Sequence, residues 1–277
     1  MGGSKTSHWW TLWGGLILVW AVFPLLWMVS LSFKDPNTFR SSTPSFFPEK
    51  WVWTNYHTVF SDSLFTSALR NSAGISVIAT GLSVIVAMFA AYAIARLDFP
   101  GKKLLLSIAL GIAMFPQAAL VGPLFNMWRQ LGIYDTWIGL IIPYLTFALP
   151  LSIWTMSAFF RQIPWEMEQA AQVDGATAWQ AFRKVIIPLA APGVFTTAIL
   201  TFFFCWNEFL LAISLTSTNR ARTVPAALSF FTGASQFQSP ITAIMAASVV
   251  VTIPVVVIVL VFQRRIVAGL TSGAVKG

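Results

Sequence analysis

Six long apolar segments dominate this chain. The first, residues 9–33, reads WWTLWGGLILVWAVFPLLWMVSLSF and contains no charged side chain. A helix needs about 20 apolar residues to cross the roughly 30 Å of hydrocarbon in a bilayer. Segments of this length predict an all-α polytopic membrane protein that forms one transmembrane domain over residues 1–277. The predicted spans are residues 9–33, 72–95, 104–127, 136–160, 186–215 and 241–262.

The composition supports this class. Hydrophobic residues make up 57% of the chain and charged residues only 9%, against about a quarter in an average soluble domain. The net charge of +8 comes from Lys and Arg residues at the ends of the spans, so no nucleic-acid partner is expected. The single cysteine, Cys205, lies inside an apolar run. This excludes a disulfide within the chain and a cysteine-based metal site, and we expect no bound metal.

The first span has a competing interpretation as a signal peptide. Residues 9–33 are too long for one, and no small-residue cleavage site follows them. Residues 34–70 and 216–240 are predicted to be external loops. Trp51, Trp53 and Tyr56 in the first loop are interpreted as membrane-interface anchors in preference to sugar-stacking groups.

The distribution of basic residues predicts the orientation. Lys and Arg accumulate in cytoplasmic loops, and six spans with both termini inside place more of them on the cytoplasmic side than outside. The inner residues are then Lys5, Arg96, Lys102, Lys103, Arg161, Arg183, Lys184, Arg264, Arg265 and Lys276.

The segment 164–188, PWEMEQAAQVDGATAWQAFRKVIIP, is polar and rich in helix punctuation. Pro164 suits a first helical turn, and Glu168 places negative charge at a helix start. Gly175 is a natural stop signal, and Thr177 with Gln180 has the spacing of a capping box. The pattern predicts a short helix of about ten residues, a glycine turn and re-entry into the membrane. This cytoplasmic helix is too short to span, so we interpret it as a docking element.

The same segment resembles the EAA loop of permease subunits in bacterial ABC importers. In that family the loop is a coupling helix that inserts into a cleft of the ATPase subunit. The resemblance implies this role for Glu168, Gln169, Ala170, Ala171, Asp174, Gly175, Ala176 and Pro188. Gln169 departs from the pattern, because a glutamate is usual there.

Other segments resemble the smaller permease of maltose-type carbohydrate importers, including the trehalose importers of mycobacteria. They are FPGKK, DTWIGLIIPYLTFALPL and FQRRIVAGLTSGAVKG. The resemblance implies a type I importer permease fold in the bacterial inner membrane. It also implies a homologous second permease, an ATPase dimer that carries ATP and Mg, and an external sugar-binding lipoprotein, with no cofactor on this chain. Contacts to the binding protein are expected at Gly233, Ala234, Ser235 and Gln236.

Polar residues near breaks in the spans are the candidates for a solute path or gate. Pro116 and Pro123 are expected to break the third span twice, next to Gln117 and Asn126; a simple packing kink is an equal alternative. A carboxylate within a span is costly and usually functional. The second group of candidates is Trp206, Asn207 and Glu208. These residues contact the solute or, as the alternative, form an interfacial or inter-subunit hydrogen bond.

No enzymatic chemistry is expected. The chain lacks a GxxxxGK[ST] phosphate loop, HExxH, GxSxG and CxxC, and its two histidines, His8 and His57, lie outside the predicted spans. An ATP-independent carrier or channel is the main alternative, but the spans show neither clear repeats nor polar stripes. We therefore expect a permease subunit that imports a disaccharide, trehalose first, with maltose, another oligosaccharide or a glycerol-phosphate-type solute as alternatives.

Overall fold

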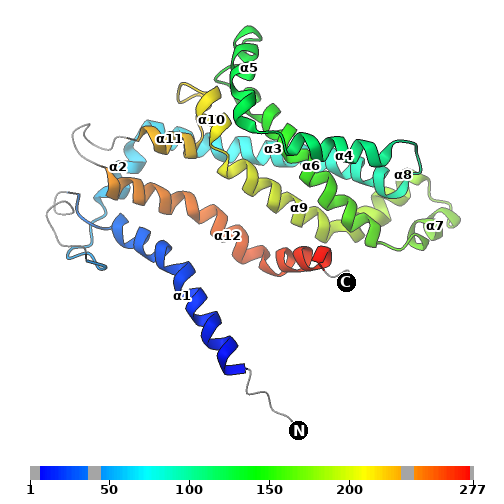
Figure 1. Cartoon of the computed structure of the whole chain (residues 1–277), viewed down its shortest axis with the longest axis horizontal. Coiled ribbons are helices and arrows are strands. Elements are labelled where there is room, and N and C mark those ends of the chain that lie inside the picture. Colours follow the sequence, from blue (N-terminus) through cyan, green and yellow to red (C-terminus); the bar gives the residue numbers. More distant parts are fainter. Residues whose placement is uncertain (1–6, 37–44, 232–239, 275–277) are drawn as a thin grey trace. The chain divides into compact units, whose positions relative to one another are not determined.

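The structure, a computed structural model, describes residues 7–36, 45–231 and 240–274, and every regular element in them is helical (Figure 1). The chain forms two compact units, residues 1–66 with 228–254 and residues 67–227 with 255–277. The helices are α1 Ser7–Ser32, α2 Thr54–Ser61, α3 Ser63–Arg96, α4 Lys102–Ala113, α5 Gln117–Gln130, α6 Trp137–Gln162, α7 Glu166–Val173, α8 Ala178–Ala181, η1 Phe182–Ile186, α9 Ile187–Asn207, α10 Leu210–Leu215, α11 Val224–Phe230 and α12 Ile241–Ala274.

The smaller unit is held together by a buried asparagine. The Asn55 amide donates to the carbonyls of Ser32 and Lys34, both at 2.8 Å, and Thr242 donates to the Asn55 carbonyl oxygen at 3.0 Å. The end of α1, helix α2 and the start of α12 thus share one polar centre. Beside it, the Phe33 ring packs against Trp51, Trp53 and Tyr56.

The loop predicted after the first span is shorter than expected. Residues 54–61 form α2, and α3 already begins at Ser63, ahead of the predicted start at residue 72. Asp62 explains the early start, because its carboxylate accepts from the Leu64 backbone N–H at 2.7 Å. A side-chain oxygen in this position satisfies one of the unpaired donors of a helix start.

The larger unit is organised around α6 and α9, which pack against each other, and α3 shares a buried core with both (Figure 1). Their shared core near one end contains Ala91 of α3, Met156 and Phe160 of α6, and Ala190 of α9, together with Phe182 of η1. Helices α7 and α8 lie at this end, and α10 packs against α5 at the opposite end (Figure 1). The predicted coupling segment therefore lies at one end of this helix group, and the predicted solute-path residues near α10 lie at the other.

Five helices of the described chain are long and apolar enough to cross a membrane, and the pair α4–α5 makes a sixth span if its two parts are counted together. The pair bends by 87°, and Pro116 precedes α5 with an extended backbone (ψ 114°). The break predicted near Pro116 is thus present. The second break, predicted near Pro123, is wrong: this proline lies within α5. Proline removes one backbone hydrogen bond from a helix, and membrane helices tolerate this loss.

The fifth predicted span, residues 186–215, is also interrupted. Helix α9 ends at Asn207, and the short helix α10 begins at Leu210. Glu208 lies at the break and supplies the acceptors that the new helix start requires, as described below. The sequence marked Glu208 as a functional candidate within this span but did not reveal the helix break there.

Helices α6 and α9 approach closely at Gly193. A Cβ atom built on this glycine would lie 2.4 Å from Cγ and 2.7 Å from Cβ of Phe159. Small residues permit such backbone approach between membrane helices. A side chain at residue 193 can fit only if the Phe159 ring and its helix shift.

We predict that Gly193→Ala destabilises the protein by about 1–3 kcal/mol, which is typical of overpacking. The midpoint of thermal unfolding in detergent would fall. The matched control is Gly81→Ala in α3, where an added Cβ meets no atom of the chain within 4 Å and alanine improves helix propensity. Equal midpoints for the two variants would contradict the close approach.

Candidate coupling corner and solute-path residues

The segment between α6 and α9 has the local structure that its sequence predicts. Helix α7 has eight residues and ends in a glycine turn, with Gly175 at φ +87°. The Ala176 N–H donates to the Ala171 carbonyl at 2.9 Å and the Gly175 N–H to the Gln172 carbonyl at 3.0 Å. These two bonds are the Schellman pattern of a helix C-terminus. Pro164 lies just before the helix, and its carbonyl accepts from the Met167 N–H.

The re-entry into α9 begins at the predicted capping box. Gln180 N–H donates to Thr177 Oγ1 at 3.3 Å, and Thr177 N–H donates to Gln180 Oε1 at 2.9 Å. After α8, residues 182–186 form a π-helical turn that leads directly into α9, with Pro188 in its first turn and exposed. Such π turns often mark functional positions in helices. We call residues 162–188 the coupling corner.

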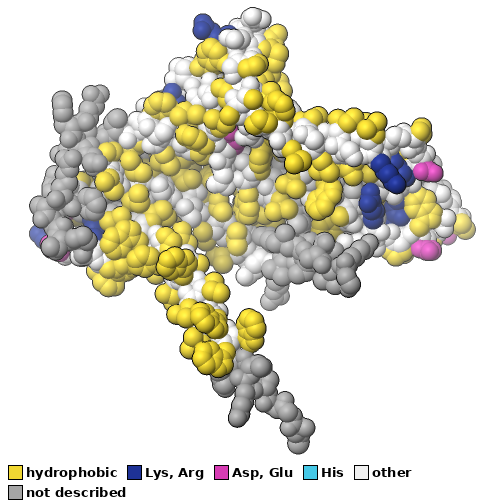
Figure 2. Space-filling view, viewed as in Figure 1, with side chains coloured by type: hydrophobic (Ala, Val, Ile, Leu, Met, Phe, Trp, Pro, Cys, Tyr) yellow, Lys and Arg dark blue, Asp and Glu magenta, His cyan; other side chains and the backbone are white. Residues whose placement is uncertain are grey.

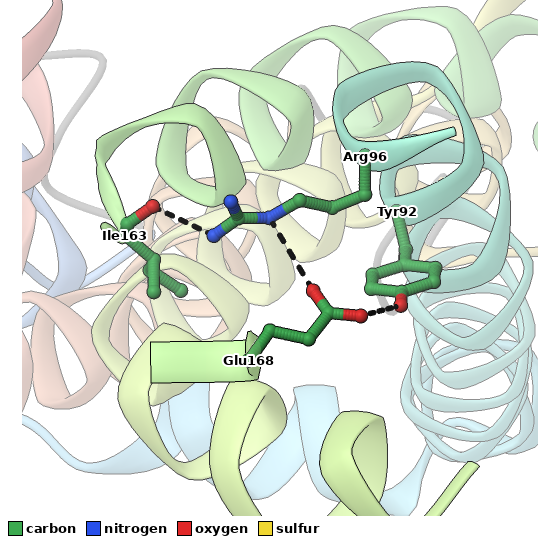
Figure 3. Close-up of polar contacts among 4 residues, drawn as sticks. All are labelled: Tyr92, Arg96, Ile163 and Glu168. Atoms are coloured by element: carbon green, nitrogen blue, oxygen red, sulfur yellow. Dashed lines mark hydrogen bonds and ion pairs between the residues drawn. The ribbon is translucent and has the colours of Figure 1, made fainter. Parts of the chain in front are cut away.

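Glu168 turns inward from α7, whereas its neighbours face outward. Its exposed fraction is 4%, and it is the only buried residue of this helix. Tyr92 Oη donates to Glu168 Oε1, and Arg96 Nε lies 3.9 Å from Glu168 Oε2 (Figure 3). Arg96 Nη2 also donates to the Ile163 carbonyl at 2.7 Å, and its guanidinium carbon lies 5.0 Å from the centre of the Trp165 ring. The last turns of α3 therefore hold the coupling corner.

Sequence reasoning missed Tyr92 and Arg96. A signal was present, because an aromatic hydroxyl and a guanidinium four residues apart share one helix face, at the end of the second predicted span. The sequence does not reveal their partner, which lies more than 70 positions further along the chain.

The outer face of α7 is exposed and contains apolar side chains. Val173 is 87% exposed, Met167 and nearby Trp165 are each almost half exposed, and Gln169 and Ala170 are also exposed. Ala171 and Ala176 are half-buried, whereas Asp174 is exposed. Figure 2 shows basic and acidic side chains gathered at this end of the larger unit, beside a surface that is mostly apolar elsewhere. Exposed apolar groups rimmed by charge are typical of an interaction surface.

The candidate solute-path residues occupy different environments. Gln117 is half-buried at the start of α5, and Asn126 is exposed further along the same helix. Trp206 is buried and stacks on Phe202 with ring centres 5.5 Å apart; its indole N–H has no hydrogen-bond partner within the described residues. Asn207 is exposed, and its amide donates to the Phe203 carbonyl at 2.8 Å. No contact that we describe joins Gln117 and Asn126 on α5 to Trp206 and Asn207 at the end of α9.

Glu208 acts as a helix cap. Its exposed fraction is 6%, and its two carboxylate oxygens accept from the backbone N–H groups of Leu211 and Ala212 at 2.7 and 3.0 Å. A negative charge at a helix start is favoured by the helix dipole. Among the described residues, this geometry joins Glu208 to the backbone of its own chain.

A polar network fixes the segment between α10 and α11, part of the second predicted external loop. The Asp135 carboxylate accepts from the backbone N–H groups of Ser217 and Thr218 at 3.0 and 3.2 Å and from the Thr218 hydroxyl at 2.5 Å. The Asn71 amide donates to the carbonyls of Asn219 and Arg222, both at 3.0 Å. Sequence reasoning missed both residues. Gly233, Ala234, Ser235 and Gln236 lie outside the described residues.

Comparison with known proteins identifies the family. Residues 83–272 match the family described as binding-protein-dependent transport system inner membrane component. This match covers α6, the coupling corner and α9. The chain belongs to this family.

Two relatives of this inner membrane component are similar along nearly their whole length. The trehalose transport system permease protein SugB of Mycobacterium tuberculosis is 54% identical over 99% of this chain and 100% of that protein. The trehalose/maltose transport system permease protein MalG of Thermococcus litoralis is 40% identical over 95% of this chain and 94% of that protein. A chain from the crystal structure of a bacterial ABC transporter that imports alginate has the same fold, with a TM-score of 0.80, 24% identity and coverage of 95% and 99%.

For this inner membrane component we predict that Glu208→Ala lowers stability by about 1–2 kcal/mol, as the loss of a helix cap does. Glu208→Gln retains one acceptor oxygen and should cost less. The midpoint of thermal unfolding in detergent measures both. If Glu208 served only to contact solute, both variants would unfold at the wild-type midpoint.

Proposed function

We propose that this chain is the translocating permease subunit of an ATP-driven importer for a disaccharide, and that the disaccharide is trehalose. The observation that carries the proposal is the 54% identity to a trehalose transport permease over the full length of both chains. The second relative, whose name includes both trehalose and maltose, makes maltose the first alternative. The importer class agrees with the family to which the chain belongs.

We propose that the outer face of α7 docks on a separate ATPase subunit. Helix α7 is short, capped at its C-terminus by Gly175 and exposed along most of its surface. The apolar side chains Met167 and Val173 offer contact area there. A rigid helix that enters a cleft can transmit the closure of an ATPase dimer to the transmembrane helices that flank it, α6 and α9.

The complete importer has further parts in this proposal. A homologous second permease pairs with this chain, an external sugar-binding lipoprotein delivers the solute, and an ATPase dimer binds ATP and Mg. Hydrolysis takes place on that dimer, and this chain binds no cofactor. Within the described residues, no group of three or more His, Cys, Asp or Glu side chains is arranged to hold a metal ion. The α7 end of the larger unit and both termini face the cytoplasm.

The first test is the uptake of labelled trehalose, maltose and an amino acid by cells that lack the gene. We expect trehalose uptake alone to be lost and the wild-type gene to restore it. Restored uptake should require ATP. Loss of maltose uptake in place of trehalose would change the solute, and unchanged uptake of all three would contradict the proposal.

The coupling role of α7 is tested in the same cells with Gly175→Val. A β-branched residue resists the left-handed conformation, which costs about 1–2 kcal/mol for L-residues, so the turn after α7 should distort. We expect normal amounts of protein in the membrane and strongly reduced trehalose uptake. Gly175→Asn is the matched control, because asparagine adopts this conformation more readily; equal uptake by the two variants would contradict the role of the turn.

A further inference from the structure

Two side chains reach from the end of α3 to the coupling corner. Tyr92 and Arg96 lie one helical turn apart, and both contact the carboxylate of Glu168 in the first turn of α7 (Figure 3). Helix α7 packs otherwise on α8 and η1, which follow it directly in the chain. The contact to α3 therefore joins α7 to a helix that is distant in sequence.

The positive charge of Arg96 and the negative charge of Glu168 compensate each other at this buried contact. The side chains of Arg96 and Glu168 are only 5% and 6% exposed, and their atoms Nε and Oε2 lie 3.9 Å apart. Neither atom has a hydrogen-bond partner in the part of the chain that the structure describes. Removing one member of such a buried pair leaves the other charge without compensation.

The remaining contacts of the two α3 residues fix the rest of the corner. Arg96 donates to the carbonyl of Ile163 and lies over the ring of Trp165, so it holds the chain just before α7 begins. The Tyr92 ring packs on Phe182 of η1 with centres 4.6 Å apart. Through these two residues, α3 contacts the start of α7 and the turn that leads into α9.

We propose that Arg96 and Tyr92 are positioning residues that lock α7 to α3 through Glu168, so that a displacement of α7 moves α3 together with α6 and α9. This inference rests on the proposed ATPase coupling. It gives Glu168 a role different from that of its exposed neighbours. Glu168 faces α3, and the docking surface is formed by side chains that point the other way.

This geometry predicts a separation of two properties. Changes at Glu168, Arg96 or Tyr92 leave the outer face of α7 intact, so the ATPase should still bind and hydrolyse ATP. Less of the resulting motion should reach the transmembrane helices. The amount of sugar transported per ATP hydrolysed should therefore fall, whereas a merely structural defect would lower the quantity of assembled complex and both activities in proportion.

The experiment uses the complete importer, purified through a tag on this chain and reconstituted in vesicles with its binding protein. Trehalose uptake and ATP hydrolysis are measured together for Glu168→Gln, Arg96→Gln and the double variant. We expect each single variant to transport at least about fivefold less sugar per ATP than the wild type. Coupling between two sites typically changes a property by this factor or more. Because the two residues form one link, the double variant should lose no more than the worse single variant.

Tyr92→Phe provides a milder test that preserves the ring and its packing. The loss of this one hydrogen bond should reduce transport per ATP by a smaller factor than Glu168→Gln does, because the Arg96–Glu168 ion pair remains. Asp98→Asn is the matched control, because Asp98 is a fully exposed carboxylate two residues beyond Arg96 and pairs with Lys102 at the surface. Exposed pairs of this kind contribute little, so its transport per ATP should equal that of the wild type.

The outcomes distinguish this inference from the proposed function. If the wild-type complex shows no ATP-dependent uptake, the proposed function fails. If the wild type transports but Tyr92→Phe and Glu168→Gln keep its ratio of sugar to ATP, only the lock is overturned. A parallel fall of both activities with the amount of complex, in Tyr92→Phe as well as in the Gln variants, would overturn it too, because the contact would then serve only assembly.

Discussion

A backbone that leaves its helix in an apolar environment needs new partners for its polar groups, and three places in the larger unit show how these partners are supplied. At the end of α9 the Glu208 carboxylate supplies two acceptors. After α7, the Gly175 turn satisfies carbonyls of the helix it ends. Asp135 gathers the three donors of residues 217–218 beyond α10. At these three places a specific side chain or a glycine turn provides the partners.

The breaks divide the larger unit into two ends with different chemistry. At one end, the coupling corner offers exposed apolar groups and a buried charged contact to α3. At the other end, Asp135 and Asn71 hold the segment between α10 and α11 by its backbone. Helices α6 and α9 run between these ends and pack closely at Gly193 and Phe159, and α3 shares their buried core near the coupling corner. This packing is the physical connection between the two ends that the proposed coupling requires.

The parts of this structure that depend on local sequence could be predicted. The apolar spans, the Gly175 turn and the Thr177–Gln180 capping box each arise from residues a few positions apart. The structure contains the turn, the capping box, and five apolar helices with one bent pair that can make a sixth span. Tyr92 and Arg96 could not be assigned, because their partner Glu168 is 76 positions beyond Tyr92, and no local pattern encodes that pairing. Glu208 is an intermediate case: a carboxylate two residues before a short apolar helix suggests a cap, but within an apolar span it is interpreted from sequence alone as an interfacial or inter-subunit hydrogen-bonding group or as a solute contact.

The two neighbouring positions 168 and 169 show why the departure from the EAA pattern is tolerated. Adjacent residues of a helix point about 100° apart, so one side chain faces α3 while the next faces outward. Glu168 is buried and needs its charge to compensate Arg96. Gln169 is exposed, so replacing the usual glutamate there leaves no buried charge unpaired. The inward contact is thus independent of residue 169, and Gln169 lies on the outer face of α7 that we propose for docking.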